Sequence, residues 1–298
     1  MLPFTPFTSP EHRDFTLISE TALGRSGDRP AALLVHGYPG TPYEMRPLAE
    51  ALYARGWTCR GILLPGFGAQ IETLPQRRWT EWREAVIEAL VALRRDHAPL
   101  LLIGHSMGGA VALTAAACLP VDGLILLAPY WRRRGVLWAL LPVLKHLFPR
   151  VKPFHLMKTE LDDPRLLNHI RDFLPEVDLT DPQTIASIRD FEVPVSMFDE
   201  LRKIGMAGWH AAPKVACPTL IIQGSEDVTV HPEDTCRLAQ RLRGPVRRLE
   251  VRAAHELVFA ESSAFPQVRE VVLEFAAQIL VESNYSASQG KKYGASTD

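Results

Sequence analysis

The stretch that most constrains the fold is PLLLIGHSMGGAVALTAAA, at residues 99–117. The apolar run before Gly104 predicts a short buried strand, and the alanine-rich run after Gly108 predicts a helix. Almost no chain remains for the turn, so we expect its central residue, Ser106, to adopt strained backbone geometry with glycines packed closely around it. The pattern G-x-S-x-G is typical of a nucleophile elbow, which exposes a serine hydroxyl above the sheet. An ordinary glycine-rich turn is the alternative that this motif alone leaves open.

The size and composition of the chain favour a globular fold. Its 298 residues suffice for one large α/β domain or two small ones with a substantial core. Hydrophobic residues make up 47% and charged residues 22%, as in ordinary soluble proteins. The formal net charge of −1 and the isoelectric point near 6.8 give no electrostatic reason to expect a nucleic-acid partner.

The cysteines and the N-terminal sequence bear on the expected compartment. The four cysteines form no C-x-x-C pair, which argues against a metal site and against a disulfide scaffold. They are Cys59, Cys118, Cys217 and Cys236. The sequence MLPFTPFTSPEHRDF lacks the basic and apolar regions of a signal peptide, and no uncharged run is long enough to span a bilayer. We therefore expect a cytoplasmic protein with no transmembrane segment.

Short apolar runs alternate with helical patterns along most of the chain. Strands are predicted at residues 29–37, 57–66, 100–103, 122–129, 217–224 and 246–252, and helices at 44–56, 79–97, 110–117 and 268–282. Because these strands are apolar throughout and alternate with helices, they predict an α/β fold with a mostly parallel central sheet covered by helices on both faces.

One long segment interrupts this alternation. Residues 130–213 contain many prolines and several helical patches but no clear buried strand. They predict a helical cap insertion over the carboxyl ends of the strands, where ligands bind in such sheets. The α/β core then comprises residues 1–129 and 214–282. Residues 283–298 have almost no apolar side chains, so we expect a disordered tail there.

Two further residues stand where partners for Ser106 are needed. A serine hydroxyl is a poor nucleophile until a base takes its proton, and a third group has to hold that base. Asp227 follows the second-last predicted strand and His255 follows the last. The chain order Ser106, Asp227, His255 is that of a known serine-nucleophile arrangement on parallel sheets. Glu226 is the competing candidate for the acid.

The negative charge that develops when a serine attacks a carbonyl also needs hydrogen-bond donors. One predicted donor is the backbone N–H of Met107, directly after Ser106. The other is the backbone N–H of Tyr38 in HGYPG, which follows the first predicted strand, because Gly37 and Gly40 let the backbone curl toward the site. A simple glycine turn would explain HGYPG alone but not its order with the other motifs.

The motifs HGYPG, GHSMGG, GSEDVTV and AAHELV, in this order, resemble the α/β-hydrolase superfamily. Within it the sequence is most similar to the bacterial carboxylesterase and monoacylglycerol-lipase-like serine hydrolases, over about residues 31–278 apart from the insertion. The resemblance implies a catalytic triad of Ser106, Asp227 and His255, an oxyanion hole formed by the N–H groups of Tyr38 and Met107, and a cap at 130–213. It implies no cofactor and no metal.

Apolar residues of the predicted cap are candidates for the substrate pocket. The stretch GVLWALLPVLKHLF places several large apolar side chains within little more than three helical turns. They could belong to a helix packed against the rest of the cap, or they could form a wall for an acyl chain. The candidate substrate-binding residues are Trp138, Leu141, Met206 and Trp209. Because Arg132, Arg133 and Arg134 precede this stretch, a second interpretation is a lid that contacts a lipid interface transiently.

The function that we expect is hydrolysis of carboxylic esters of short to medium acyl chain through an acyl-enzyme. A monoacylglycerol or other lipid ester is the nearest variant, and thioesterase, peptidase and acyltransferase chemistry use the same triad. A catalytically silent ligand-binding protein of this fold is the alternative from another class. The expected partner is a small ester or lipid-like substrate, and the expected state is a monomer or a homodimer.

Overall fold

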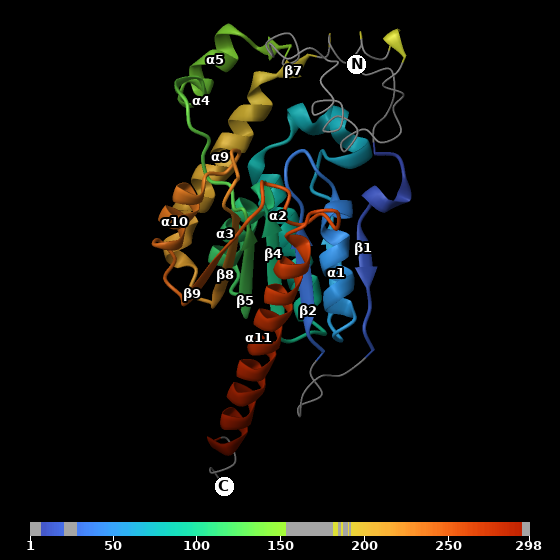
Figure 1. Ribbon diagram of the computed structural model, residues 1–298, viewed down its shortest axis with the longest axis vertical. Coiled ribbons are helices and arrows are strands. Elements are labelled where there is room, and N and C mark those ends of the chain that lie inside the picture. The colour runs from blue at the N-terminus through green and yellow to red at the C-terminus, as the bar shows by residue number, and fades with distance from the viewer. Residues whose placement is uncertain are drawn as a thin grey trace.

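A seven-stranded sheet forms the centre of the protein, with the strand order β1-β3-β2-β4-β5-β8-β9 (Figure 1). The computed structural model describes residues 7–20, 29–152, 181–183, 186, 190 and 192–293, with only the backbone of 286–293. β1 runs antiparallel to β3, and the other neighbouring pairs of this sheet are parallel. The strands are β1 (Phe15–Leu17), β2 (Ala31–Val35), β3 (Thr58–Ile62), β4 (Leu100–His105), β5 (Gly123–Leu127), β8 (Thr219–Gly224) and β9 (Val246–Val251). The predicted α/β-hydrolase fold class is confirmed.

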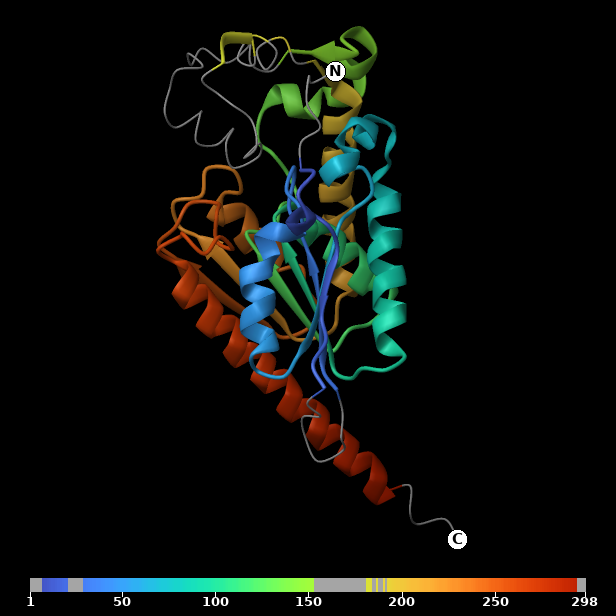
Figure 2. The same cartoon turned by 90° about the vertical axis from the view of Figure 1, so that its right-hand side faces the viewer.

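Helices cover both faces of the sheet, as Figure 2 shows from the side. One face carries α1 (Arg46–Tyr53) and α11 (Phe265–Tyr293). The other carries α2 (Trp79–Arg94), α3 (Met107–Cys118), α9 (Val195–Ala211) and α10 (Pro232–Ala239). Short 3-10 helices are η1 (Pro10–His12), η2 (Pro42–Met45), η3 (Gly68–Gln76) and η4 (Ala212–Lys214).

The central strands are apolar throughout because both faces of the sheet are buried. Successive strand residues point to opposite faces, so β2 contributes Leu33 and Val35 to one hydrophobic core and Ala32 and Leu34 to the other. All four side chains are fully buried. Each buried leucine contributes roughly 1.5–3 kcal/mol relative to an exposed one. This double burial keeps the parallel strands in one register, and their carboxyl ends therefore meet at one edge.

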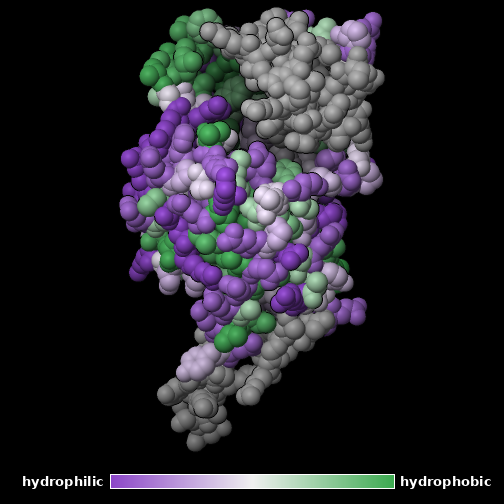
Figure 3. Space-filling view, viewed as in Figure 1, coloured by the Kyte–Doolittle hydropathy of each residue, from purple (hydrophilic) through white to green (hydrophobic). Residues whose placement is uncertain are grey.

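Two short helices lie beyond that edge, within the predicted cap. They are α4 (Val136–Ala139) and α5 (Leu141–Leu147), and the short strands β6 (Arg150–Val151) and β7 (Val193–Pro194) pair antiparallel beside them. Figure 3 shows an apolar surface over α4 and α5. Its exposed side chains include Val136, Leu137, Leu140, Val143, Leu147 and Phe148. Residues 153–180, 184–185, 187–189 and 191 of the predicted cap lie outside the described residues.

The last helix of the predicted insertion packs against the core instead of standing apart from it. A Cβ atom at Gly208 of α9 would lie 3.1 Å from the Cα of Ala110 in α3. A Cβ atom at Gly205 would overlap the carbonyl oxygen of Trp131 and lie 2.7 Å from Cε1 of Tyr130. The two glycines let the helix approach this closely, so α9 belongs to the helical layer on the sheet.

The C-terminal helix is longer than its sequence suggests. We expected a disordered tail at residues 283–298, but α11 runs to Tyr293, and residues 294–298 of this tail lie outside the described part of the chain. Once a helix is nucleated, each further residue adds one backbone hydrogen bond, so a segment without proline continues it even with few apolar side chains. The last turns of α11 extend past the sheet (Figure 2).

The close packing of α9 predicts the effect of Gly205→Ala. In an unconstrained helix this change adds about 0.5–1 kcal/mol of stability, because alanine is the better helix former. Here the new methyl group would overlap the Trp131 carbonyl. We therefore expect a loss of about 1–3 kcal/mol in the free energy of unfolding, measured in urea. A variant as stable as the wild type, or more stable, would contradict this account of the helix packing.

Candidate active site

Ser106 lies in a strained turn between β4 and α3. Its φ of 51° and ψ of −116° place a non-glycine residue in a sparsely populated region of backbone space. A Cβ atom at Gly104 would overlap the backbone at Gly108, and one at Gly108 would overlap the carbonyl oxygen of Val35. The predicted elbow geometry is confirmed, and both flanking glycines are sterically required.

The structure brings Ser106, His255 and Asp227 into one hydrogen-bonded chain. His255 Nε2 lies 2.9 Å from Ser106 Oγ, and His255 Nδ1 lies 2.7 Å from Asp227 Oδ2. Asp227 is buried, whereas the side chain of His255 is 16% exposed. A carboxylate only accepts, so Nδ1 of His255 donates to Asp227, which leaves Nε2 free to accept the hydroxyl proton of Ser106.

Four donors surround the carboxylate of Asp227. The backbone N–H groups of Thr229 and Val230 each donate to Oδ1 at 2.8 Å, and Gln223 Nε2 donates to Oδ2 at 3.0 Å beside His255. Burial alone would raise the pKa of Asp227, but the bonds from His255, Val230 and Gln223 outweigh it and hold the pKa below its ordinary value. The carboxylate therefore stays ionised and fixed in place.

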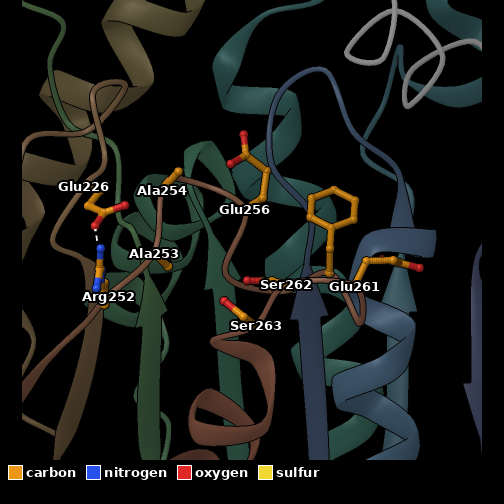
Figure 4. A pocket seen from close by; sticks show the side chains of 9 residues that line it. Glu226, Arg252, Ala253, Ala254, Glu256, Glu261, Ser262 and Ser263 are labelled. Atoms are coloured by element: carbon orange, nitrogen blue, oxygen red, sulfur yellow. Dashed lines mark hydrogen bonds and ion pairs between the residues drawn. The ribbon is translucent and has the colours of Figure 1, made fainter. Parts of the chain in front are cut away.

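Glu226, the alternative acid, points elsewhere. Its Oε1 lies 2.9 Å from Nε of Arg252, and both side chains are exposed. Figure 4 shows this pair at the edge of a surface pocket, whose lining also includes Glu256, Glu261 and Ser262. Because Asp227 and not Glu226 contacts His255, the geometry distinguishes the two candidates.

The two predicted oxyanion donors belong to segments next to Ser106, one at the start of α3 and one in the loop after β2. Met107 begins α3, where the first N–H groups of a helix have no partner within the helix. Tyr38 lies in the loop after β2. Neither N–H has an acceptor among the residues that the structure describes. Both are therefore available to a bound negative charge, which the positive end of the α3 dipole would also favour.

The sequence analysis missed two buried polar residues, one beside the Tyr38 loop and one beside Asp227. Glu44 accepts the backbone N–H of Gly37 at 2.6 Å and lies 2.8 Å from Nδ1 of His105. Gln223 donates to Asp227 and to the carbonyl of Val230, both at 3.0 Å. A carboxylate at the start of a helix and an amide at the end of a strand carry no sequence signal of such roles.

The four candidate substrate-binding residues divide into two groups. Trp138 in α4 contacts Tyr130 and Phe198, with ring centroids 6.5 and 6.4 Å away, and the first residue of α5, Leu141, is buried.

The other two residues lie in α9. Met206 is half-buried between the tightly packed glycines. Trp209 stacks on Trp131 with ring centroids 4.1 Å apart, and the Arg241 guanidinium lies 4.3 Å from its ring. These contacts give Trp209 a packing role.

The described part of the chain contains no group of three or more His, Cys, Asp or Glu side chains arranged to hold a metal ion. Within the same residues, no helix combines the length and the apolar character needed to cross a bilayer.

The donors around Asp227 predict how stability depends on pH. Because they lower the pKa, their contribution is present above the ordinary carboxyl value of 3.8 and is lost as the pH falls through the lower folded-state value. We expect the wild type to be more stable than Asp227→Asn at about pH 6, with a difference that is smaller at about pH 3, below the ordinary carboxyl value. Urea unfolding at both pH values measures it, and a difference independent of pH would contradict the assignment.

Comparisons with known proteins identify the family of the chain. Residues 28–262 match the family described as serine aminopeptidase, S33. A thermostable monoacylglycerol lipase from Bacillus sp. (strain H-257) is 38% identical over 84 residues, which cover 28% of this chain and 34% of that protein. A carboxylesterase from Bacillus subtilis (strain 168) is 28% identical over 102 residues, which cover 34% and 41%. The matched segments thus span less than half of the length of these relatives.

Solved structures share the whole fold. One from work on two metagenome-derived lipolytic enzymes, LipS and LipT, superposes with a TM-score of 0.69 over 90% of this chain and 98% of that one, at 21% identity. This likeness concerns the fold alone. The family match, over residues 28–262, covers most of the chain. The chain therefore belongs to the serine aminopeptidase S33 family of the α/β hydrolases.

Proposed function

We propose that the protein is a serine hydrolase that cleaves carboxylic esters of short to medium acyl chain, with Ser106 as nucleophile, His255 as base and Asp227 as the acid of the triad. The observation that carries the proposal is the chain of contacts from Ser106 Oγ to His255 Nε2, 2.9 Å, and from His255 Nδ1 to Asp227 Oδ2, 2.7 Å. The first distance permits proton transfer between a nucleophile and its base, and the second is that of a hydrogen bond that holds the base in place.

The first half of the reaction forms the acyl-enzyme. His255 Nε2 takes the proton of Ser106 as Oγ bonds to the ester carbonyl carbon, and the carbonyl oxygen becomes an oxyanion. The backbone N–H groups of Tyr38 and Met107 stabilise that oxyanion, by roughly 3 kcal/mol each in comparable enzymes. The protonated His255 then gives its proton to the departing alcohol as the carbon–oxygen bond breaks.

The second half repeats these steps with water. His255 takes a proton from water, the hydroxide attacks the acyl carbonyl, and the proton returns to Ser106 as the carboxylic acid leaves. Asp227 remains ionised throughout and stabilises the imidazolium that forms twice in each cycle. Its buried carboxylate with four donors is suited to this role because it has no freedom to turn away from His255.

Two features support an ester substrate with an apolar acyl chain. The relatives with matching segments are a monoacylglycerol lipase and a carboxylesterase. Trp138 contacts Tyr130, whose backbone N–H donates to the carbonyl of Ser106, so Trp138 and the nearby Leu141 would contact an acyl chain entering beneath α4 and α5. A monoacylglycerol or another lipid ester is the variant of the proposal that such a wall would also accept.

A series of p-nitrophenyl esters from acetyl to palmitoyl tests the substrate class. We expect kcat/KM to peak at short or medium chains and to fall by about 10⁴-fold or more in Ser106→Ala, which lacks the nucleophile. Ser225→Ala, at an exposed serine outside the triad, is the control and should keep wild-type activity.

Each outcome of this series has a distinct meaning. A peak at long chains would replace the proposal by its lipid-ester variant. Cleavage of amino-acyl p-nitroanilides in preference to every ester would replace it by peptidase chemistry. No Ser106-dependent turnover of any substrate would contradict it.

Two neighbouring carboxylates allow a matched test of the acid. Asp227→Asn should lower kcat by about 10⁴-fold, as in comparable triads, because the amide no longer holds His255 in the productive tautomer. Glu226→Gln should leave kcat within about two-fold of the wild type, because the Glu226 side chain pairs with Arg252 at the surface and not with His255. Steady-state kinetics on one p-nitrophenyl ester measure both, and equal losses in the two variants would contradict the assignment of Asp227.

A further inference from the structure

A buried pair of side chains, Glu44 and His105, lies directly behind the triad. Glu44 belongs to η2, and His105 is the last residue of β4, next to Ser106. Their exposed fractions are 7% and 4%, and Glu44 Oε1 lies 2.8 Å from His105 Nδ1. The mechanism above uses neither residue. Burying a carboxylate is costly in desolvation unless it is paired and hydrogen-bonded, so the partners of Glu44 need an explanation.

Both ring nitrogens of His105 face acceptors. Nδ1 faces the carboxylate of Glu44, and Nε2 lies 3.3 Å from the backbone carbonyl oxygen of His255. A neutral imidazole carries a single N–H and would satisfy only one of them. With Glu44 ionised, both bonds together require an imidazolium, which makes Glu44 and His105 a buried ion pair.

The electrostatic surroundings agree with this protonation state. Burial alone would raise the pKa of Glu44 and lower that of His105, but their mutual attraction and hydrogen bond outweigh burial in both. The pKa of Glu44 is therefore lowered and that of His105 raised. The other titratable groups that act on the pair are Asp227, which also favours the imidazolium, His36, and His255, whose ring centroid lies 5.2 Å from that of His105.

Three separate segments of the site meet at this pair. The same Oε1 atom of Glu44 accepts the N–H of Gly37, at the start of the loop that carries Tyr38. A Cβ atom at Gly40, on the other side of that loop, would overlap the Glu44 carboxylate. His105 joins the elbow directly, and its Nε2 bond reaches the backbone of His255. One ion pair thus connects the oxyanion loop, the nucleophile turn and the loop of the base.

We propose that the Glu44–His105 ion pair is a positioning unit, which holds the oxyanion loop and the His255 loop at fixed places relative to Ser106. This inference rests on the proposed function. Neither residue contacts the reacting atoms, so both act through the groups that they hold. Without the charge of Glu44, His105 becomes neutral and keeps only one of its two bonds, and one loop loses its anchor.

The protonation state can be measured without any substrate. In protein with ¹⁵N-labelled histidine, we expect one imidazole with both nitrogens protonated at about pH 7.5, above the range in which an unperturbed histidine is charged. Its signals should vanish in His105→Asn and change to those of a neutral ring in Glu44→Gln. A neutral His105 in the wild type would overturn the ion pair and with it the proposal.

The positioning role is tested by kinetics of Glu44→Gln, a substitution that keeps shape and removes charge. We expect kcat to fall by about 10- to 100-fold, as when reacting groups are displaced by about 1 Å, and KM to stay within about two-fold. If the pair positions the loops, kcat of the wild type should decline at high pH as His105 loses its proton. In Glu44→Gln this decline should move to lower pH, because without the Glu44 charge His105 loses its proton more easily. His105→Asn, which can still reach Glu44 but not the His255 carbonyl, should show the same loss of kcat.

A carboxylate at the opposite edge of the sheet serves as control. Asp122 Oδ2 accepts the backbone N–H of Leu100 at 2.8 Å, at the amino end of β4. Asp122→Asn should lower stability but leave kcat and its pH profile unchanged. Wild-type kcat in Glu44→Gln, or a loss that merely follows the folded fraction without a shift in the pH profile, would overturn the positioning role alone. A wild type inactive on all esters would overturn the proposed function, while the ¹⁵N measurement would still decide the ion pair.

Discussion

The close backbone packing around the turn at Ser106 is the constraint on which the site depends. Gly104 and Gly108 place no side chain between β4, the start of α3 and the end of β2, where a Cβ atom would overlap backbone atoms. The chain can therefore reverse here with Ser106 at a positive φ. That geometry exposes Oγ to His255 and leaves the first N–H of α3 without a partner in the helix. The parallel sheet, buried on both faces, supplies the packing that offsets the backbone strain.

Two buried carboxylates hold the loops around this turn in a similar way. Asp227 fixes the ring of His255 from one side, and Glu44 contacts the oxyanion loop and His105 from the other. Each is buried and each is surrounded by donors, which is the condition for a charge to remain inside a protein. The site therefore consists of a serine that is 7% exposed, a partly exposed imidazole and two buried carboxylates behind them.

Local sequence signals sufficed for the residues at the strand ends. Ser106, Asp227 and His255 each follow a predicted strand, and the carboxyl ends of parallel strands converge. Glu44 was missed because its partner His105 lies 61 residues away, and no spacing rule connects them. β1, β6 and β7 have only two or three residues, too few for a periodic pattern. The core packing of α9 depends on Gly205 and Gly208, whose neighbours come from other segments.

The most direct test of the central claim is the reaction of the folded protein with a fluorophosphonate, followed by peptide mass mapping. We expect one adduct per chain, on Ser106, and a much slower reaction in His255→Gln, because the hydroxyl then has no base. An unreacted Ser106, or equal labelling with and without His255, would contradict the claim that this turn presents an activated nucleophile.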